Sequence, residues 1–133
     1  MNAQCHHIGI ITVHADDLVS FYADKLGFEV MGAKTVPQDL MASIFRLECS
    51  GKLVKMKMGE AVLEIISPED GVLENREVRH EGINHWSLGV PDRDEYLSSL
   101  EERGVEPLEY LKGNQKIVFV EDPDGNLVEI YKI

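Results

Sequence analysis

The strongest constraint on the fold is an order of strands and helices that occurs twice along the chain. Each half begins with an apolar strand, continues into a helix that stops at a glycine, and then has three further stretches of strand character. His85 follows His7 by 78 residues and Gly104 follows Gly27 by 77, so the halves repeat at a nearly constant interval. The sequence therefore predicts two copies of one unit of a strand, a helix and three strands.

The first half shows this order in its hydrophobic spacing. Asp16 is expected to cap a helix, and Gly27 is expected to end it. Gly59 and Glu60 predict a tight turn between the last two strands. The predicted elements are a strand at 6–14, a helix with Leu18, Phe21, Tyr22 and Leu26 on one face, and strands at 28–34, 53–58 and 61–67.

The second half repeats the order with different residues. Pro91 and Asp92 precede its helix, and Gly104 ends it. The tetrapeptide Asp122-Pro123-Asp124-Gly125 predicts a turn before the final strand, because glycine readily takes positive φ. The predicted elements are a strand at 83–90, a helix with Tyr96, Leu97 and Leu100 on one face, and strands at 106–111, 116–121 and 127–132.

The first half carries an insertion. Glu129 follows Glu64 by only 65 residues, so about 13 extra residues lie between the first helix and Glu64. Pro37 starts a segment in which Leu40, Ile44 and Leu47 have helical spacing, with Met41 and Phe45 beside them. This predicts a short extra helix at 38–47, which either packs on the core or forms a lid over a ligand pocket.

Composition limits the class of protein. The chain has 13 basic and 24 acidic residues, a net charge of −11 and no run of Lys and Arg, which argues against nucleic acid and anionic membranes as partners. Its start lacks a signal-like segment, and no apolar stretch is long enough to span a bilayer. We expect a cytoplasmic protein in which Cys5 and Cys49 are reduced.

We expect one domain over residues 1–133. At 133 residues and 44% hydrophobic composition, the chain can bury a single core, and no low-complexity linker interrupts it. The predicted first module covers about 5–67, a polar connection covers 68–82, and the second module covers about 83–133.

A histidine and a glutamate recur in matching strands of the two halves. His7 and His85 lie in the opening strands, and Glu64 and Glu129 lie in the closing strands. Because side chains alternate across a strand, all four are expected on the face away from the helices. A charge in an apolar strand costs free energy unless a partner compensates it, so this pattern suggests a shared divalent metal. Two imidazoles and two carboxylates suit Zn, Ni, Co or Mn.

Each of these residues also has an ordinary structural interpretation. A lone strand histidine is more often hydrogen-bonded at an edge or in a core, and a lone strand glutamate more often faces solvent. His6, His14 and His80 have no counterpart in the other half, so we interpret them as surface or supporting residues. Arg46, Lys55 and Lys57 could meet an anionic substrate, although a solvated face also explains the two lysines.

Several of these motifs resemble those of the vicinal oxygen chelate superfamily. The resemblance is carried by His7-Ile8-Gly9-Ile10, Phe21-Tyr22, Leu26-Gly27-Phe28, His85, and Asp122-Pro123-Asp124-Gly125-Asn126 followed by Glu129. This superfamily includes glyoxalase I, methylmalonyl-CoA epimerase, extradiol dioxygenases and fosfomycin resistance proteins. The resemblance covers essentially the whole chain. It implies an α+β fold in which two tandem βαβββ modules form a cupped mixed sheet around a divalent metal, with the extra helix in the first module.

The resemblance also implies site residues and an activity. His7, Glu64, His85 and Glu129 fall on the superfamily's metal positions, and this set is similar to that of bacterial glyoxalase I. Ile11 stands where that enzyme has a basic residue for the glutathione carboxylate, which argues against glutathione as the cosubstrate. Bacterial glyoxalase I shares its metal sites between two chains, whereas other members complete the site within one chain. We expect a homodimer with either arrangement.

The expected reaction follows from this set of ligands. A metal-chelated substrate with two adjacent oxygens has an acidic C–H, and proton loss gives a metal-stabilised enediolate. We expect Glu129 to be the base, with Glu64 the second candidate, and we assign Ile11, Phe45, Arg46 and Ser87 to the pocket of the small-molecule substrate. The sequence thus favours a glyoxalase I-like lyase. An epimerase of a carboxylate or thioester and a non-catalytic, antibiotic-type binding protein remain alternatives.

Overall fold

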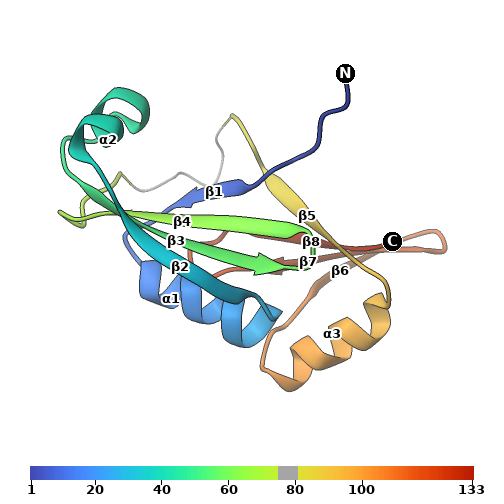
Figure 1. Cartoon of the computed structure of the whole chain (residues 1–133). Helices are drawn as coiled ribbons and strands as arrows, with labels where there is room; N and C mark the ends of the chain where they lie inside the picture. Colours follow the sequence, from blue (N-terminus) through green and yellow to red (C-terminus); the bar gives the residue numbers. More distant parts are fainter. Residues whose placement is uncertain (75–80) are drawn as a thin grey trace. The chain divides into compact units, whose positions relative to one another are not determined.

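The chain folds into two compact units, residues 1–76 and 77–133, each built on its own four-stranded mixed sheet. This computed structural model describes residues 1–74 and 81–133 (Figure 1). The two sheets, each accompanied by a crossover helix, confirm the predicted α+β class with tandem βαβββ modules. The predicted connection at 68–82 includes residues 75–80, so His80 lies outside the described residues.

The first unit has the strand order β1-β4-β3-β2, in which only β1 and β4 are parallel. Its opening strand is shorter than the predicted 6–14, because β1 pairs with β4 only along the stretch from Leu63 to Ile66. The elements are β1 (Ile8–Ile11), α1 (Ala15–Ser20), the π-helical segment η1 (Phe21–Leu26), β2 (Glu29–Val36), α2 (Gln38–Phe45), β3 (Gly51–Met58) and β4 (Ala61–Pro68).

The first helix covers one face of this sheet. It begins one residue before the predicted cap Asp16, with His14 at the N-cap position. It continues through η1 and ends at Gly27, whose φ of 98° is the left-handed conformation that glycine adopts without steric cost. Its inward side chains and those of the facing strands are fully or almost fully buried; they are Leu18, Tyr22, Leu26, Val54, Met56, Leu63 and Ile65.

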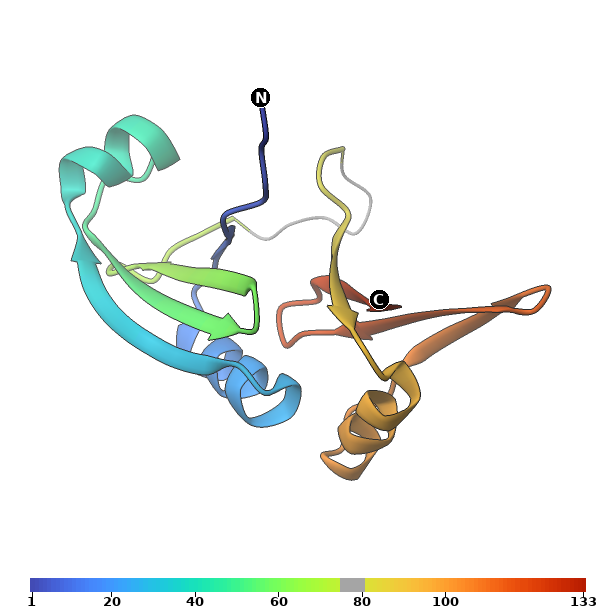
Figure 2. The same ribbon diagram turned by 45° about the vertical axis from the view of Figure 1, so that its right-hand side comes forward.

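The extra helix α2 packs on the opposite face of the same sheet. Met41 is completely buried and forms a cluster with Val36, Leu53 and Ile66, against which Leu47 also packs. Leu53 and Ile66 are directly paired and alternate with residues that face α1, so α2 and α1 lie on opposite sides of the sheet (Figure 2). These contacts support the core-packing interpretation of the inserted helix.

The apolar residues of α2 do not all face the sheet. Leu40 and Ile44, which the spacing grouped with Leu47, are 42% and 67% exposed. Met41 occupies the contact instead, because a helix of eight residues touches the sheet over little more than one turn.

The second unit repeats the arrangement with the strand order β5-β8-β7-β6, and β5 and β8 are parallel. Asp92, which was predicted only to precede the helix, caps it, because its carboxylate accepts a hydrogen bond from the Glu95 backbone N–H at 3.0 Å. Leu97 and Leu100 are buried on the helix. The elements are β5 (His85–Val90), α3 (Arg93–Glu102), β6 (Leu108–Lys112), β7 (Gln115–Glu121) and β8 (Leu127–Lys132).

Among the described residues, no helix combines the length and apolar character that crossing a bilayer would require.

The packing of α2 can be tested with two substitutions on the same helix. Met41→Ala should lower the free energy of unfolding by about 2–4 kcal/mol, because it leaves a cavity among buried side chains. Ile44→Ala removes a largely exposed side chain and should change stability by less than about 0.5 kcal/mol. Urea unfolding followed by circular dichroism measures both values, and equal losses would contradict the packing described for α2.

Candidate functional site

The first unit brings together the first predicted His and Glu. His7 immediately precedes β1, and Glu64 lies in the middle of β4. Gly9 is the residue paired with Glu64, so His7 lies two residues before the aligned position and on the same face. The Nε2 atom of His7 is 3.2 Å from Oε2 of Glu64, and the two side chains are 41% and 23% exposed.

The second unit forms the same pair in the same register. Ser87 is the residue paired with Glu129, and His85 lies two residues before Ser87. The Nε2 atom of His85 is 3.6 Å from Oε2 of Glu129, and these side chains are 38% and 24% exposed. The two units therefore place a His–Glu pair at equivalent positions of their sheets.

Each imidazole is oriented by the residue before it. The Nδ1 atoms of His6 and His7 are 2.8 Å apart, and Nδ1 of His85 is 2.9 Å from Oδ1 of Asn84. His85 also meets Phe119 edge-on, with ring centroids 5.0 Å apart. Supporting contacts of this kind select which nitrogen of a histidine remains available as a ligand. Sequence reasoning missed Asn84 and Phe119, although a polar residue precedes the histidine in both halves.

The hydrogen bond that Nδ1 of His85 donates to Oδ1 of Asn84 decides which ring nitrogen faces Glu129. Because Oδ1 of Asn84 can only accept, His85 carries a proton on Nδ1 and, when neutral, a lone pair on Nε2. The Nε2 atom that carries this lone pair lies 3.6 Å from Oε2 of Glu129. Two acceptors that face each other need a cation between them, which is either a proton on Nε2 or a bound metal ion.

The distances fit shared metal ligands. Two ligands at the usual N and O bond lengths of a tetrahedral metal are about 3.4 Å apart. The pairs, at 3.2 Å and 3.6 Å, lie on either side of this value. Within the described part of the chain, no three His, Cys, Asp or Glu side chains come together as a metal site. Each unit on its own thus presents two of the four predicted ligands.

The residues assigned to the substrate pocket lie at several places in the two units. Ile11 is the last residue of β1 and is 42% exposed on the His7 side of the sheet. Phe45 ends α2 and is 39% exposed, and Arg46 follows it with a φ of 60°. The hydroxyl of Ser87 donates to the backbone carbonyl of Glu129 at 3.4 Å. Their assignment to a pocket stays a prediction.

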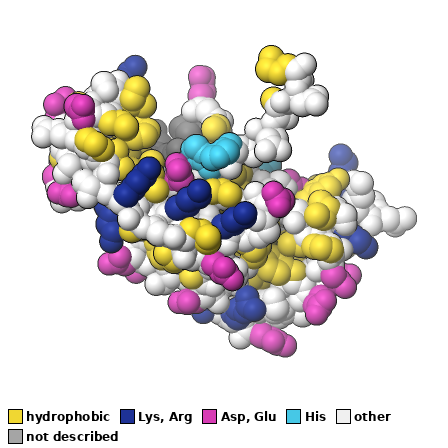
Figure 3. Space-filling view, in the orientation of Figure 1, with side chains coloured by type: hydrophobic (Ala, Val, Ile, Leu, Met, Phe, Trp, Pro, Cys, Tyr) yellow, Lys and Arg dark blue, Asp and Glu magenta, His cyan; other side chains and the backbone are white. Residues whose placement is uncertain are grey.

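The face of the first sheet opposite α1, which we call the open face, carries a groove. Glu64, one of the predicted ligands, lines this groove. It has a volume of about 280 Å³ and lies over β2, β3 and β4, where basic side chains form a row in Figure 3. None of the four residues predicted for the substrate pocket lines it. Its lining residues are Met31, Gly32, Ala33, Lys34, Leu53, Lys55 and Glu64. Lys34 was not predicted as a site residue from the sequence, although it lies two residues from Gly32 and from Val36 and therefore shares their face of β2.

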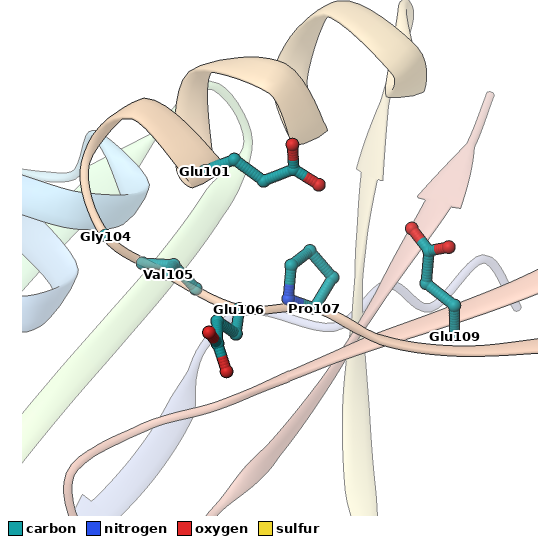
Figure 4. Close-up of a pocket in the computed structure, with 6 residues that line it drawn as sticks. All are labelled: Glu101, Gly104, Val105, Glu106, Pro107 and Glu109. Carbon is teal, nitrogen blue, oxygen red and sulfur yellow. The ribbon is translucent and has the colours of Figure 1, made fainter.

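A larger hollow in the second unit lies apart from His85 and Glu129. It measures about 620 Å³ and lies beside the end of α3, with Glu101 and Glu109 on either side of Pro107 in Figure 4. Glu109 is paired with Lys116 at 3.0 Å. The lining residues are Glu101, Gly104, Val105, Glu106, Pro107 and Glu109, none of which was predicted as a site residue.

The turn before β8 fixes the strand that carries Glu129. Asp122 is only 4% exposed, and its Oδ1 accepts hydrogen bonds from the backbone N–H groups of Asp124 at 3.0 Å and Asn126 at 2.9 Å. Its Oδ2 accepts from Nδ2 of Asn126 at 2.9 Å. Gly125 has a φ of 82°, as the predicted turn requires. This buried carboxylate closes the turn from which β8 starts.

Known proteins with similar sequences support the assignment of this fold to a family. The model of the Glyoxalase/Bleomycin resistance protein/Dioxygenase superfamily matches residues 4–130, and the chain belongs to this superfamily. It is 27% identical over 132 residues to the uncharacterized protein YwkD of Bacillus subtilis, covering 96% of this chain and 94% of that protein. It is also 27% identical over 131 residues to the catechol-2,3-dioxygenase of Bacillus subtilis, covering 94% of this chain but only 41% of that enzyme.

Solved structures share the fold along nearly the whole chain. A glyoxalase family protein from Enterococcus faecalis is 25% identical with a TM-score of 0.72, covering 96% of this chain and 95% of that one. The trypanothione-dependent glyoxalase I of Leishmania major is 23% identical with a TM-score of 0.71, covering 98% and 87%. The antibiotic-binding protein TnmS3 from Streptomyces sp. CB03234 is 15% identical with a TM-score of 0.66, covering 98% and 96%. The fold of this chain thus occurs both in an enzyme and in an antibiotic-binding protein.

The Asp122 turn can be tested by removing its acceptors in two steps. Asp122→Ala deletes three hydrogen bonds to a buried carboxylate and should lower the free energy of unfolding by about 2–4 kcal/mol. Asp122→Asn keeps Oδ1 and should lose less. Both values come from urea unfolding. A loss below about 0.5 kcal/mol for the alanine variant would contradict a role for Asp122 in holding the turn.

Proposed function

We propose that His7, Glu64, His85 and Glu129 bind one divalent metal per site, and that the chain is a metal-dependent lyase or isomerase of the glyoxalase I type. The supporting observation is the His–Glu pair that recurs at the same register in both units, with Nε2 and a carboxylate oxygen at 3.2 Å and 3.6 Å. The ligand set suits Zn, Ni, Co or Mn. The site is completed either within one chain or between two chains of a homodimer.

The metal would act as a Lewis acid on a substrate with two adjacent oxygens. Glu129 then accepts the proton: the C–H bond breaks, its electron pair moves into the adjoining carbonyl, and an enediolate forms. The same carboxylic acid returns that proton to the neighbouring carbon, and the hydroxyl proton on the oxygen of the first carbon passes to the oxygen of the second, so that the substrate is isomerised without loss of atoms. Glu64 is the second candidate for this role. Both carboxylates are about one quarter exposed, which leaves them accessible to a bound substrate.

The substrate is proposed to differ from the glutathione adduct. Ile11 is a partly exposed apolar residue. Bacterial glyoxalase I, which this chain resembles, has a basic side chain at that position. An isoleucine cannot pair with the carboxylate of glutathione. Another thiol adduct or another substrate with adjacent oxygens therefore fits better.

The second candidate function is a non-catalytic binding protein for an apolar small molecule. The open face of the second sheet carries aromatic and aliphatic side chains, because Leu108 and Tyr110 pair with Phe119 and Ile117 on the face that holds Glu129. Leu108 is 53% exposed and Tyr110 is 67% exposed. An exposed apolar surface of this kind suits a small-molecule ligand. Fold likeness to the antibiotic-binding protein TnmS3 is consistent with this alternative.

Metal binding separates the two candidates. Elemental analysis of purified protein should find about one divalent metal per chain, and zinc titration should give at least tenfold weaker binding for His7→Ala and for His85→Ala. His14→Ala is the matched control, because His14 lies in the first unit at the start of α1. Absence of bound metal, or equal loss in the control, would favour the binding-protein alternative.

The role of Glu129 as the base can be tested with a glutamate on the same face. Glu129→Gln should lower kcat by about 10²–10⁴-fold with methylglyoxal and a panel of thiols, while some metal remains bound. Glu121→Gln is the control, since Glu121 pairs with Leu127 and shares the face of Glu129. Unchanged turnover in Glu129→Gln with full metal content would transfer the role to Glu64 or remove it altogether.

A further inference from the structure

The open face of the first sheet concentrates positive charge in a strongly acidic protein. The chain has a net charge of −11, yet β2 and β3 present Lys34, Lys55 and Lys57 on the face that carries Glu64. The register establishes this directly. Lys55 pairs with Glu64, and Lys34 pairs with Leu53, which lies two residues from Lys55 on β3 and therefore on the same face. Figure 3 shows the resulting row of basic side chains.

The carboxylates aligned with these lysines lie beyond ion-pair distance. In the described part of the chain, no ion pair within 4.0 Å involves any of the three, although Glu29 is aligned with Lys57 and Glu64 with Lys55. Glu64 instead makes its close contact with His7. Like charges at neighbouring positions on one face of a sheet repel each other. A bound anion would relieve this repulsion.

Two of the lysines line the groove of about 280 Å³ beside Glu64. Gly32 pairs with Lys55 and leaves open space on this face, because a Cβ built there meets nothing within 4 Å. Leu53 contributes an apolar surface to the groove. The groove therefore combines room, a small apolar wall and two ammonium groups next to a predicted metal ligand.

We propose that Lys34 and Lys55 form a subsite for an anionic group, a carboxylate or a phosphate, on the substrate whose reacting atoms lie at the proposed metal. This inference rests on the proposed function for the role of the anion. Two glutamates already neutralise the charge of a divalent metal, so a substrate anion needs positive charge from elsewhere. Lys34 and Lys55 supply it from the strands next to Glu64. Lys57, which does not line the groove, would strengthen the local potential.

Binding is tested with inorganic phosphate and with succinate, separately, by NMR titration of the ¹⁵N-labelled full chain, with and without zinc. Amide shifts should saturate over residues 31–34 and 53–55, and the Lys34→Gln/Lys55→Gln double variant should bind at least about tenfold more weakly. Lys52→Gln is the control, because Lys52 lies on the same strand with its side chain on the opposite face. The anion that binds more tightly identifies the class of group.

Three results would overturn the subsite: no saturable shift, shifts located elsewhere, or an equal loss in Lys52→Gln. Because the titration is also run without zinc, anion binding can still be measured if the protein does not bind metal. With an active enzyme, the double variant should lose the preference for mercaptoacetate over 2-mercaptoethanol as the thiol. Its kcat/KM should fall by a larger factor with mercaptoacetate than with the neutral thiol, because only the mercaptoacetate adduct carries the carboxylate that the two lysines would bind.

Discussion

Parallel pairing of the first and last strand in each unit is the constraint on which the rest of the structure depends. Two parallel neighbours cannot be joined by a hairpin, so the chain must cross over, and it does so through a helix. That helix covers one face of each sheet. On the other face, which α2 covers in part in the first unit, β1–β4 and β5–β8 display polar groups. The crossover thus separates a packed face from a face available for chemistry.

The open face explains why charged residues can occupy the centre of a strand. Glu64 and Glu129 lie between completely buried apolar neighbours on their strands, yet each remains about one quarter exposed on the opposite side. Partial hydration limits the cost of desolvating each carboxylate, and the nearby imidazole provides a first partner. A site of this kind is held in place by the sheet without burying its charges in the core.

Much of this arrangement could be predicted from the sequence, and the limits have physical causes. Alternation along a strand is strict, so the face of Glu64 and Glu129 followed directly from their apolar neighbours. Helical periodicity was less decisive for α2, because a short helix contacts the sheet through one turn and Met41 rather than Ile44 made the contact. The groove was not foreseen, since it depends on the pairing of β2 with β3, which places Lys34 near Lys55. The register between strands that are distant in the sequence cannot be predicted from local sequence patterns.

The alternation of the closing strands also restricts how this chain can change length. Adding or deleting one residue within β4 before Glu64 would shift the register by one position and turn the carboxylate toward α1, while moving Leu63 onto the open face. The hairpin at residues 113–114, between β6 and β7, lies outside this constraint because its length alters no residue of β8. Length variation compatible with the site should therefore collect in such loops, and the closing strands should keep their spacing even where their side chains differ.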